Sequence, residues 1–202
     1  MSLSEKAQAT RERILTAASQ LFYLHGYNAT GLDKIISLAG VTKGNFYYYF
    51  KSKEELAVAS LDWHFDYTAK QISEEVLYKN YSPINALFSL LHLMSDRQKK
   101  QHDEGHIQGC YFGNFTLELS TTSSLVRAKV KSIFKQYLEM ITDLLKQAQK
   151  ANEIAEHLNP VEMAAIILSQ IEGAILIDKA NQEPHSVDTN IKFIKQYLSK
   201  SA

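Results

Sequence analysis

The stretch TKGNFYYYFKSK, residues 42–53, decides the fold because it predicts a short helix with two different faces. Thr42 is suited to cap this helix, since its hydroxyl can accept a hydrogen bond from a free backbone N–H group. Phe46 and Phe50 are four residues apart, so they share one side of the helix and should face a core. The polar and aromatic residues between them are left for the opposite side, where a partner can reach them.

Two helices are predicted before this stretch. Apolar residues recur at helical spacing over residues 7–25, and Gly26 ends that first helix. Thr30, followed three residues later by Asp33, is expected to cap a second, short helix that Gly40 ends. Only a few residues then separate the second helix from the third, so the two cannot lie antiparallel. This arrangement is typical of a helix-turn-helix.

A long helix should follow and link this region to the rest of the chain. Ser52 and Glu55 form a capping-box pattern at its start. Four residues are expected to share its inner face: Leu56, Ala59, Trp63 and Tyr67. The next helix is predicted from Pro83 to about Met94, and the polar residues 96–108 are expected to form a loop or a frayed helix end.

Four further helices are predicted in the C-terminal half. A short one covers residues 110–119, and a long one carries an apolar stripe made of Val126, Val130, Ile133, Tyr137, Ile141, Leu144 and Ala148. Asn159 and Pro160 begin a helix to about Lys179 that is apolar on nearly every side. The last helix is amphipathic, with Val187, Ile191, Ile194 and Leu198 on one face. The chain is therefore expected to be all-α, with about nine helices.

The last two helices are expected to form half of an intersubunit four-helix bundle, because a helix that is apolar all round must be covered on both faces. The alternative is that both simply complete the core of a monomer. We place the domain boundary at the linking helix. Residues 1–53 are predicted to be a helix-turn-helix DNA-binding domain, and residues 54–202 a helical dimerisation domain.

Charge and composition narrow the class of protein. The formal net charge is zero, but residues 1–53 hold seven lysine or arginine residues against three acidic ones, an excess of four. The single cysteine, Cys110, cannot form an intramolecular disulfide, and no signal segment is evident, so a cytoplasmic protein is expected. The longest apolar stretch, residues 163–177, is interrupted by polar residues and is too short for a membrane span.

The residue types of the third helix suit a DNA groove. Thr42 and the start of the helix offer a hydroxyl and backbone N–H groups to a phosphate, and Gly44 allows close approach of the backbone. Asn45 can donate to and accept from a base edge, while Lys43 supplies a positive charge. The tyrosines can reach a phosphate or lie against a thymine methyl group. The other interpretation is that the tyrosines only pack and the lysines are merely solvated.

Residues 9–56 resemble the TetR family of bacterial regulators, on the strength of several coincident spacings. The matching segments are the His25-Gly26-Tyr27 end of the first helix, Thr30 to Leu38, Ala39-Gly40-Val41, and the run from Lys43 to Phe50 that closes on Lys53. The resemblance implies that nine residues face DNA: Thr30, Thr42, Lys43, Gly44, Asn45, Tyr47, Tyr48, Tyr49 and Lys53. Asn45 and Tyr48 would contact bases. Tyr49 departs from the histidine that many relatives have there.

The same resemblance implies a homodimer on a palindromic operator, and a repressor that a small-molecule ligand releases. Residues 54–202 are then the ligand-sensing and dimerisation domain. Residues 109–115 also resemble a segment of one large branch of the family, where a helix begins beside the ligand pocket. A hydrophobic or aromatic ligand is expected, and no cofactor. The candidate pocket residues, taken from the inner stripes, are Trp63, His64, Tyr67, Phe88, His92, Phe112, Phe115, Glu118, Tyr137 and Gln170. Each of these can equally be a core residue.

Three other functions are alternatives to ligand release: a thiol response, metal binding and enzyme activity. Cys110, near His106 at a helix start, suggests a thiol-responsive or electrophile-responsive repressor, although a free cysteine is more often buried and inert. The segment from His102 to Cys110 holds several possible metal ligands without a zinc-finger-like framework, so no metal is expected. A helical enzyme using His64, His92 or Glu118 lacks any recognisable catalytic motif, so the protein is not expected to be an enzyme.

Overall fold

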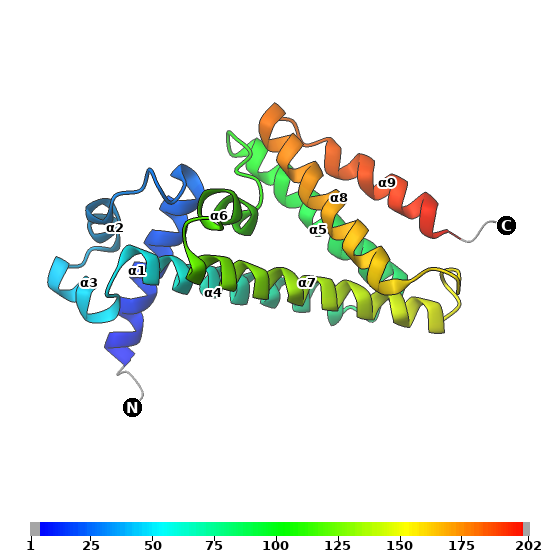
Figure 1. Ribbon diagram of the computed structural model, residues 1–202, viewed down its shortest axis with the longest axis horizontal. Helices are drawn as coiled ribbons and strands as arrows, with labels where there is room; N and C mark the ends of the chain where they lie inside the picture. The colour runs from blue at the N-terminus through cyan, green and yellow to red at the C-terminus, as the bar shows by residue number, and fades with distance from the viewer. Residues whose placement is uncertain (1–4, 200–202) are drawn as a thin grey trace. The chain divides into compact units, whose positions relative to one another are not determined.

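The computed structural model describes residues 5–199, and within them it contains α-helices, one π-helical turn and no strand (Figure 1). The nine α-helices confirm the all-α prediction. In chain order the elements are α1 (Glu5–His25), α2 (Leu32–Ala39), α3 (Lys43–Tyr49), α4 (Lys53–Ile72), η1 (Ser73–Leu77), α5 (Pro83–Asp103), α6 (Tyr111–Leu119), α7 (Ser124–Lys150), α8 (Pro160–Asn181) and α9 (Ser186–Leu198).

The helices form two compact units. The first unit consists of the chain up to Thr68 together with Tyr111–Lys131, and the second unit consists of Ala69–Cys110 together with the chain from Ser132 onward. The helices α4 and α7 each contribute to both units. The first unit therefore holds α1, α2, α3 and α6, and the second holds α5, α8 and α9. Each unit has its own buried apolar core.

The start of α2 differs from the prediction. Gly31, not Thr30, is the N-cap of α2. The Thr30 side chain is fully buried, and its hydroxyl donates to the backbone carbonyls of Leu21 (3.2 Å) and Gly26 (2.7 Å). A threonine hydroxyl can donate as well as accept, and here it satisfies carbonyls at the end of α1 rather than N–H groups at the start of α2. The other end of α2 is as predicted, because Gly40 adopts a left-handed conformation with φ of 61°.

The start of α4 confirms one half of the predicted capping box. The Ser52 hydroxyl accepts from the backbone N–H of Glu55 at 3.0 Å, but the Glu55 carboxylate accepts from the N–H of Lys51 rather than from that of Ser52. The predicted inner face of α4 is wrong beyond Leu56, since Tyr67 is 54% exposed and Ala59 and Trp63 are only half-buried. The buried residues are Leu56, Ala57, Ser60, Leu61, Thr68 and Ile72. The buried face is therefore rotated around the helix from the one predicted.

The helix α5 runs nine residues beyond Met94, to Asp103, where a loop or frayed end was expected from residue 96. Its polar C-terminal half is helical because some of its polar side chains are buried and satisfied within the second unit. The side-chain oxygen of Gln101 accepts from the backbone N–H groups of Gln108 (2.7 Å) and Gly109 (3.2 Å). A polar stretch is therefore not always a solvent-exposed loop.

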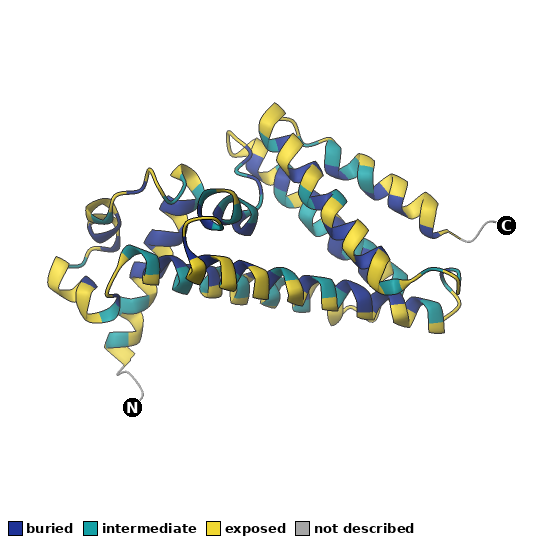
Figure 2. Cartoon of the chain, in the orientation of Figure 1, coloured by how far each residue is buried: buried dark blue, intermediate teal, exposed yellow. Residues whose placement is uncertain are grey.

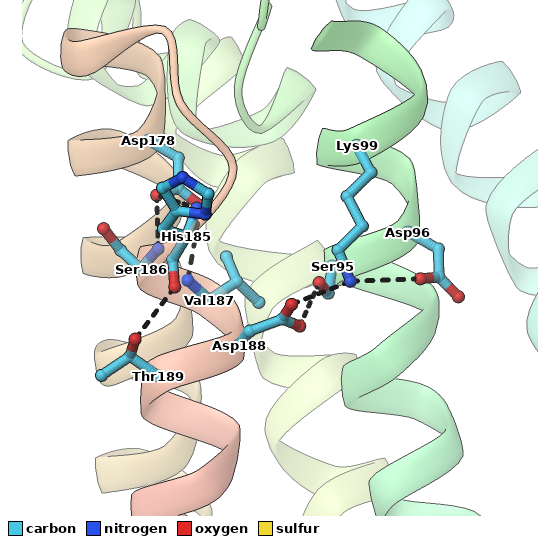
Figure 3. Close-up of polar contacts among 9 residues, drawn as sticks. All are labelled: Ser95, Asp96, Lys99, Asp178, His185, Ser186, Val187, Asp188 and Thr189. Atoms are coloured by element: carbon cyan, nitrogen blue, oxygen red, sulfur yellow. Dashed lines mark hydrogen bonds and ion pairs between the residues drawn. The ribbon is translucent and has the colours of Figure 1, made fainter. Parts of the chain in front are cut away.

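Two carboxylates hold α9 in the second unit (Figure 3). Asp178 of α8, which is 1% exposed, accepts from the backbone N–H groups of His185, Ser186 and Val187 at 3.2, 2.7 and 3.3 Å. At the next residue, Asp188 accepts from the Ser95 hydroxyl and lies 2.8 Å from the Lys99 ammonium of α5. The start of α9 is thus fixed to both α8 and α5.

Candidate nucleic-acid interface and effector site

The helix α3 has one buried face and one exposed face, as predicted. Phe46 and Phe50 are 0% and 1% exposed, and their ring centroids are 5.9 Å apart. The opposite face is open, with Tyr48 68% exposed and Tyr47 43% exposed (Figure 2). The two phenylalanines anchor the helix, so the outward residues are presented on a fixed backbone.

The first turn of α3 is exposed as well. Thr42 caps the helix by accepting from the backbone N–H of Asn45 at 3.2 Å, which confirms the predicted cap. Lys43 lies 3.4 Å from Asp33, and both side chains are mostly exposed, so this ion pair is weak and its lysine can be recruited by another anion. A Cβ atom added at Gly44 would meet only the Thr42 hydroxyl, at 4.0 Å. The fold itself therefore does not require a glycine at position 44.

The remaining predicted DNA-facing residues, Tyr49, Lys53 and Thr30, differ in how far they are buried and in what they contact. Tyr49 is half-buried, with its ring 4.9 Å from that of Tyr48. The Lys53 ammonium lies 4.1 Å from the centre of the Tyr27 ring, a cation–π contact. Burial lowers the pKa of Lys53, and the negative charge of Glu118 opposes that shift. Thr30 is a correction: its buried hydroxyl is bonded to carbonyls, so it cannot face DNA in this conformation.

Six of the predicted effector residues lie in the first unit, where two of them, Phe112 and Phe115, belong to a buried aromatic core. Phe112 and Phe115 of α6 are buried, and the Phe115 ring packs edge-on against Phe22 with centroids 5.6 Å apart. The His64 ring stacks on Tyr111 at 4.1 Å, and Trp63 stacks on Tyr67 at 6.2 Å. Glu118 instead accepts backbone hydrogen bonds from Tyr27 and Asn28. Phe112 and Phe115 therefore have a packing role, whereas Tyr67 is exposed and Glu118 holds a backbone turn.

The other four predicted effector residues lie in the second unit, and the structure does not gather them at one point. Phe88 is half-buried, with the Lys195 ammonium 6.0 Å from its ring, and His92 is exposed. Gln170 lines a groove between α8 and α9, whereas Tyr137 is buried. His92 is therefore at the surface rather than on an inner stripe, because the inner face of α5 is formed instead by residues such as Leu87, Leu90 and Leu91.

A polar cluster around Tyr137 was missed in the sequence. Burial raises the pKa of Tyr137, and charge interactions with Cys110 and Glu172 add to the shift. Burial also raises the pKa of Glu172, while a hydrogen bond from the Cys110 side chain opposes that shift. The signal that could have revealed this cluster is Glu172 itself, a carboxylic acid within an otherwise apolar helix. Tyr137 is buried and Cys110 and Glu172 are half-buried, so these three side chains gather titratable groups at one place in the second unit.

The outer faces of α8 and α9 are apolar. Ile166, Leu176 and Ile177 of α8 and Phe193 and Tyr197 of α9 are each about half exposed. Between the two helices lies a groove of about 220 Å³, lined by Met163, Ile166, Ile167, Gln170, Phe193, Ile194 and Tyr197. By length and composition α8 is also apolar enough to cross a membrane, but a core helix of a soluble protein passes the same test.

The possible metal ligands near Cys110 are not gathered into a site. His102 and Asp103 are mostly exposed, and their closest ring nitrogen and carboxylate oxygen are 3.5 Å apart. Across residues 5–199, no group of three or more histidine, cysteine or acidic side chains is placed to hold a metal ion.

Comparison with known proteins gives the family. Residues 14–60 match the model described as bacterial regulatory proteins, tetR family, and residues 86–194 match the tetracyclin repressor-like C-terminal domain. An uncharacterized HTH-type transcriptional regulator from Lactococcus lactis is 31% identical over 95% of this chain and 94% of its own length. The HTH-type transcriptional repressor DhaR from a Mycobacterium species is 28% identical over 95% of this chain and 93% of its own length.

Solved structures agree on the fold. The reduced form of NemR from Escherichia coli aligns with a TM-score of 0.87 and 22% identity, covering 96% of this chain and 98% of that one. The exposed α3 beside α2 and the matched domains define a helix-turn-helix transcriptional regulator that binds DNA. The chain belongs to the tetR family of bacterial regulatory proteins. Both matched domains are those of regulators and not of an enzyme family.

Proposed function

We propose that this regulator is a cytoplasmic homodimeric repressor that binds a palindromic operator and is released from it by a small hydrophobic or aromatic effector. The observation that carries the proposal is the two-faced α3. Phe46 and Phe50 fix the helix from inside, while Tyr47, Tyr48 and Asn45 are exposed within residues 1–53, which carry an excess of positive charge. This is the geometry that a helix needs to enter a major groove.

In this proposal the residues of α3 divide into two groups. Asn45 and Tyr48 contact base edges, because both are exposed and Tyr48 is the most exposed side chain of the helix's aromatic run. Phosphate contacts come from Thr42, Lys43, Tyr47, Tyr49 and Lys53, with Gly44 allowing the backbone to approach the duplex. Thr30 is omitted from the set because it is buried.

The test of operator binding is selection of bound DNA from random duplexes with the purified protein. We expect a palindrome, because a two-fold protein dimer binds two equivalent half-sites. A Gly44→Ala variant sharpens the test. The fold has room for the added methyl group and alanine favours a helix, so thermal stability should be unchanged or higher. Operator affinity should fall at least tenfold, because the methyl group meets the duplex. Recovery of no preferred sequence would contradict the proposal.

The dimer interface is proposed at α8 and α9. Their uncovered faces hold half-exposed isoleucine, leucine and aromatic side chains on two adjacent helices, and such patches are typical of protein interfaces. The side-chain oxygen of Gln170, which lines the groove, is buried without a hydrogen-bond partner among the described residues. A donor from a second copy would satisfy it. The sequence pattern alone had left open a purely monomeric role for these helices.

The effector proposal rests on the interior of the second unit. Tyr137 is buried beside Cys110 and Glu172, so an apolar core here contains a few groups able to hydrogen bond to a ligand. The effector would act only through different affinities for the DNA-competent and DNA-incompetent states. Titration of hydrophobic and aromatic compounds against operator binding tests this, and compounds that bind tightly without changing operator affinity would count against release. Among residues 5–199 no observation favours the thiol-responsive alternative.

A further inference from the structure

The turn between α1 and α2 is held by a carboxylate from α6. The Glu118 side chain accepts from the backbone N–H of Tyr27 at 3.0 Å and from that of Asn28 at 2.9 Å, with a different oxygen for each bond. A Cβ atom added at Gly26 would lie 2.6 Å from the Glu118 carboxylate. The carboxylate therefore closes tightly on this turn, more than ninety residues away along the chain.

The same turn positions a cation on the DNA-facing side of the first unit. The Tyr27 ring is packed against Phe22 and Phe115, with centroids 5.4 and 6.2 Å apart, and the Lys53 ammonium lies 4.1 Å from its centre. Phe115 and Glu118 are three residues apart, so they lie on one face of α6. One helix thus fixes the Tyr27 ring through Phe115 and the Tyr27 backbone through Glu118.

We propose that Glu118 is a positioning residue for operator binding, which fixes the α1–α2 turn so that Tyr27 holds Lys53 at the phosphate backbone. This inference rests on the proposed operator binding. Lys53 is the first residue of α4 and follows the last residue of α3 after only three intervening residues, and its ammonium is held against the Tyr27 ring. Glu118 is the residue that fixes the backbone of this ring's residue.

Two Glu118 variants test the proposal against simple electrostatics. Glu118→Gln removes a negative charge near Lys53, so electrostatics alone would leave operator binding unchanged or make it tighter. Glu118→Asp keeps the charge but shortens the side chain. If Glu118 positions Lys53, both variants should raise the operator Kd about tenfold despite their different charges. Glu139→Gln, a matched change at an exposed residue of α7, should stay within twofold of the unmodified protein.

A double variant separates positioning from general destabilisation. Lys53→Gln alone should weaken binding and reduce the slope of log K against log salt by about 0.9, the value for one lost phosphate contact. In the Lys53→Gln background, Glu118→Asp should cost little further affinity, because its effect acts through Lys53. An equal cost with and without Lys53 would overturn the proposal, and so would wild-type affinity in both Glu118 variants.

Amide exchange provides a readout that needs no variant. The N–H groups of Tyr27 and Asn28 should exchange much more slowly than in an unfolded peptide, because both are bonded to Glu118. Exchange as fast as in the peptide would overturn the inference even if the variants fail to fold. A protein that selects no duplex would refute both the proposed function and this inference. An unmodified protein that binds its operator, with unaffected variants, would refute this inference alone.

Discussion

The helix α3 and the pair α8 and α9 each leave one face uncovered, but the chemistry of the two faces is opposite. On α3 the apolar residues Phe46 and Phe50 are buried, and the uncovered face is polar and tyrosine-rich. On α8 and α9 the uncovered face is itself apolar, with Ile166 and Phe193 each about half exposed. The first surface suits a hydrated, charged partner such as DNA, and the second suits another apolar surface.

The two faces of α3 should therefore respond differently to the same truncation, and this is the largest effect we expect. Phe46→Ala removes a fully buried ring and should lower the free energy of unfolding by about 4 kcal/mol. Tyr48→Ala, at a position 68% exposed, should change it by less than about 0.5 kcal/mol. Tyr48→Ala should nevertheless weaken operator binding about tenfold.

Chemical denaturation of both variants and operator titration of Tyr48→Ala check this contrast. The outcome that would undo it is a Tyr48 variant that loses stability but keeps its affinity for DNA. The tyrosine would then be a packing residue, the interpretation that the sequence alone had left open.

A charge placed on the apolar face tests the other side of the comparison. Ile166→Asp puts a carboxylate in the middle of the proposed interface, so the dimer dissociation constant should rise at least about a hundredfold, or about 3 kcal/mol. Leu125→Asp is the matched control, since Leu125 is 58% exposed but lies on α7 in the first unit. Sedimentation equilibrium measures both variants. A dimer that survives Ile166→Asp would place the interface elsewhere.

The difference between these faces also shows which structural features could be predicted from the sequence. The orientation of α3 could be predicted because the spacing of Phe46 and Phe50 allows only one buried side. The N-cap of α2 could not be predicted, because a threonine hydroxyl can either accept from the N–H groups that follow it or donate to the carbonyls that precede it. The length of α5 was missed because Gln98 and Gln101 are buried, which a pattern of polar residues does not reveal.

The effector site could be predicted least. Core packing and ligand contact require the same aromatic residues at the same helical spacing, so Phe112 and Phe115 fit either role in the sequence, and in the structure both are buried in the first unit. Glu172 was chemically distinctive, because a carboxyl group within an apolar helix is costly to bury unless it is hydrogen-bonded, as Glu172 is to Cys110. This acid therefore pointed to the polar cluster around Tyr137 more directly than the aromatic residues did.

The smallest effect concerns what holds α9 and its apolar face in place. Burial raises the pKa of Asp188, but hydrogen bonds from Lys99 and Ser95 outweigh it and keep that pKa below its ordinary value of 3.8. Hydrogen bonding to Asp188 raises the pKa of Lys99 above 10.5. The stabilisation by Asp188 is therefore complete above pH 3.8 and is lost as the pH falls through its lowered pKa, and that by Lys99 is lost only above pH 10.5.

Asp188→Asn should therefore lower the free energy of unfolding by about 0.5–1 kcal/mol near neutral pH, a modest value because both charged side chains are partly exposed. The difference from the unmodified protein should be present near neutral pH and shrink toward zero below pH 3.8, because the lowered pKa of Asp188 depends on its charged neighbours Lys99 and His92. Denaturant unfolding across this range measures it. A difference that is unchanged in acid would mean that Asp188 acts by packing, and that the ion pair with α5 does not help to hold α9.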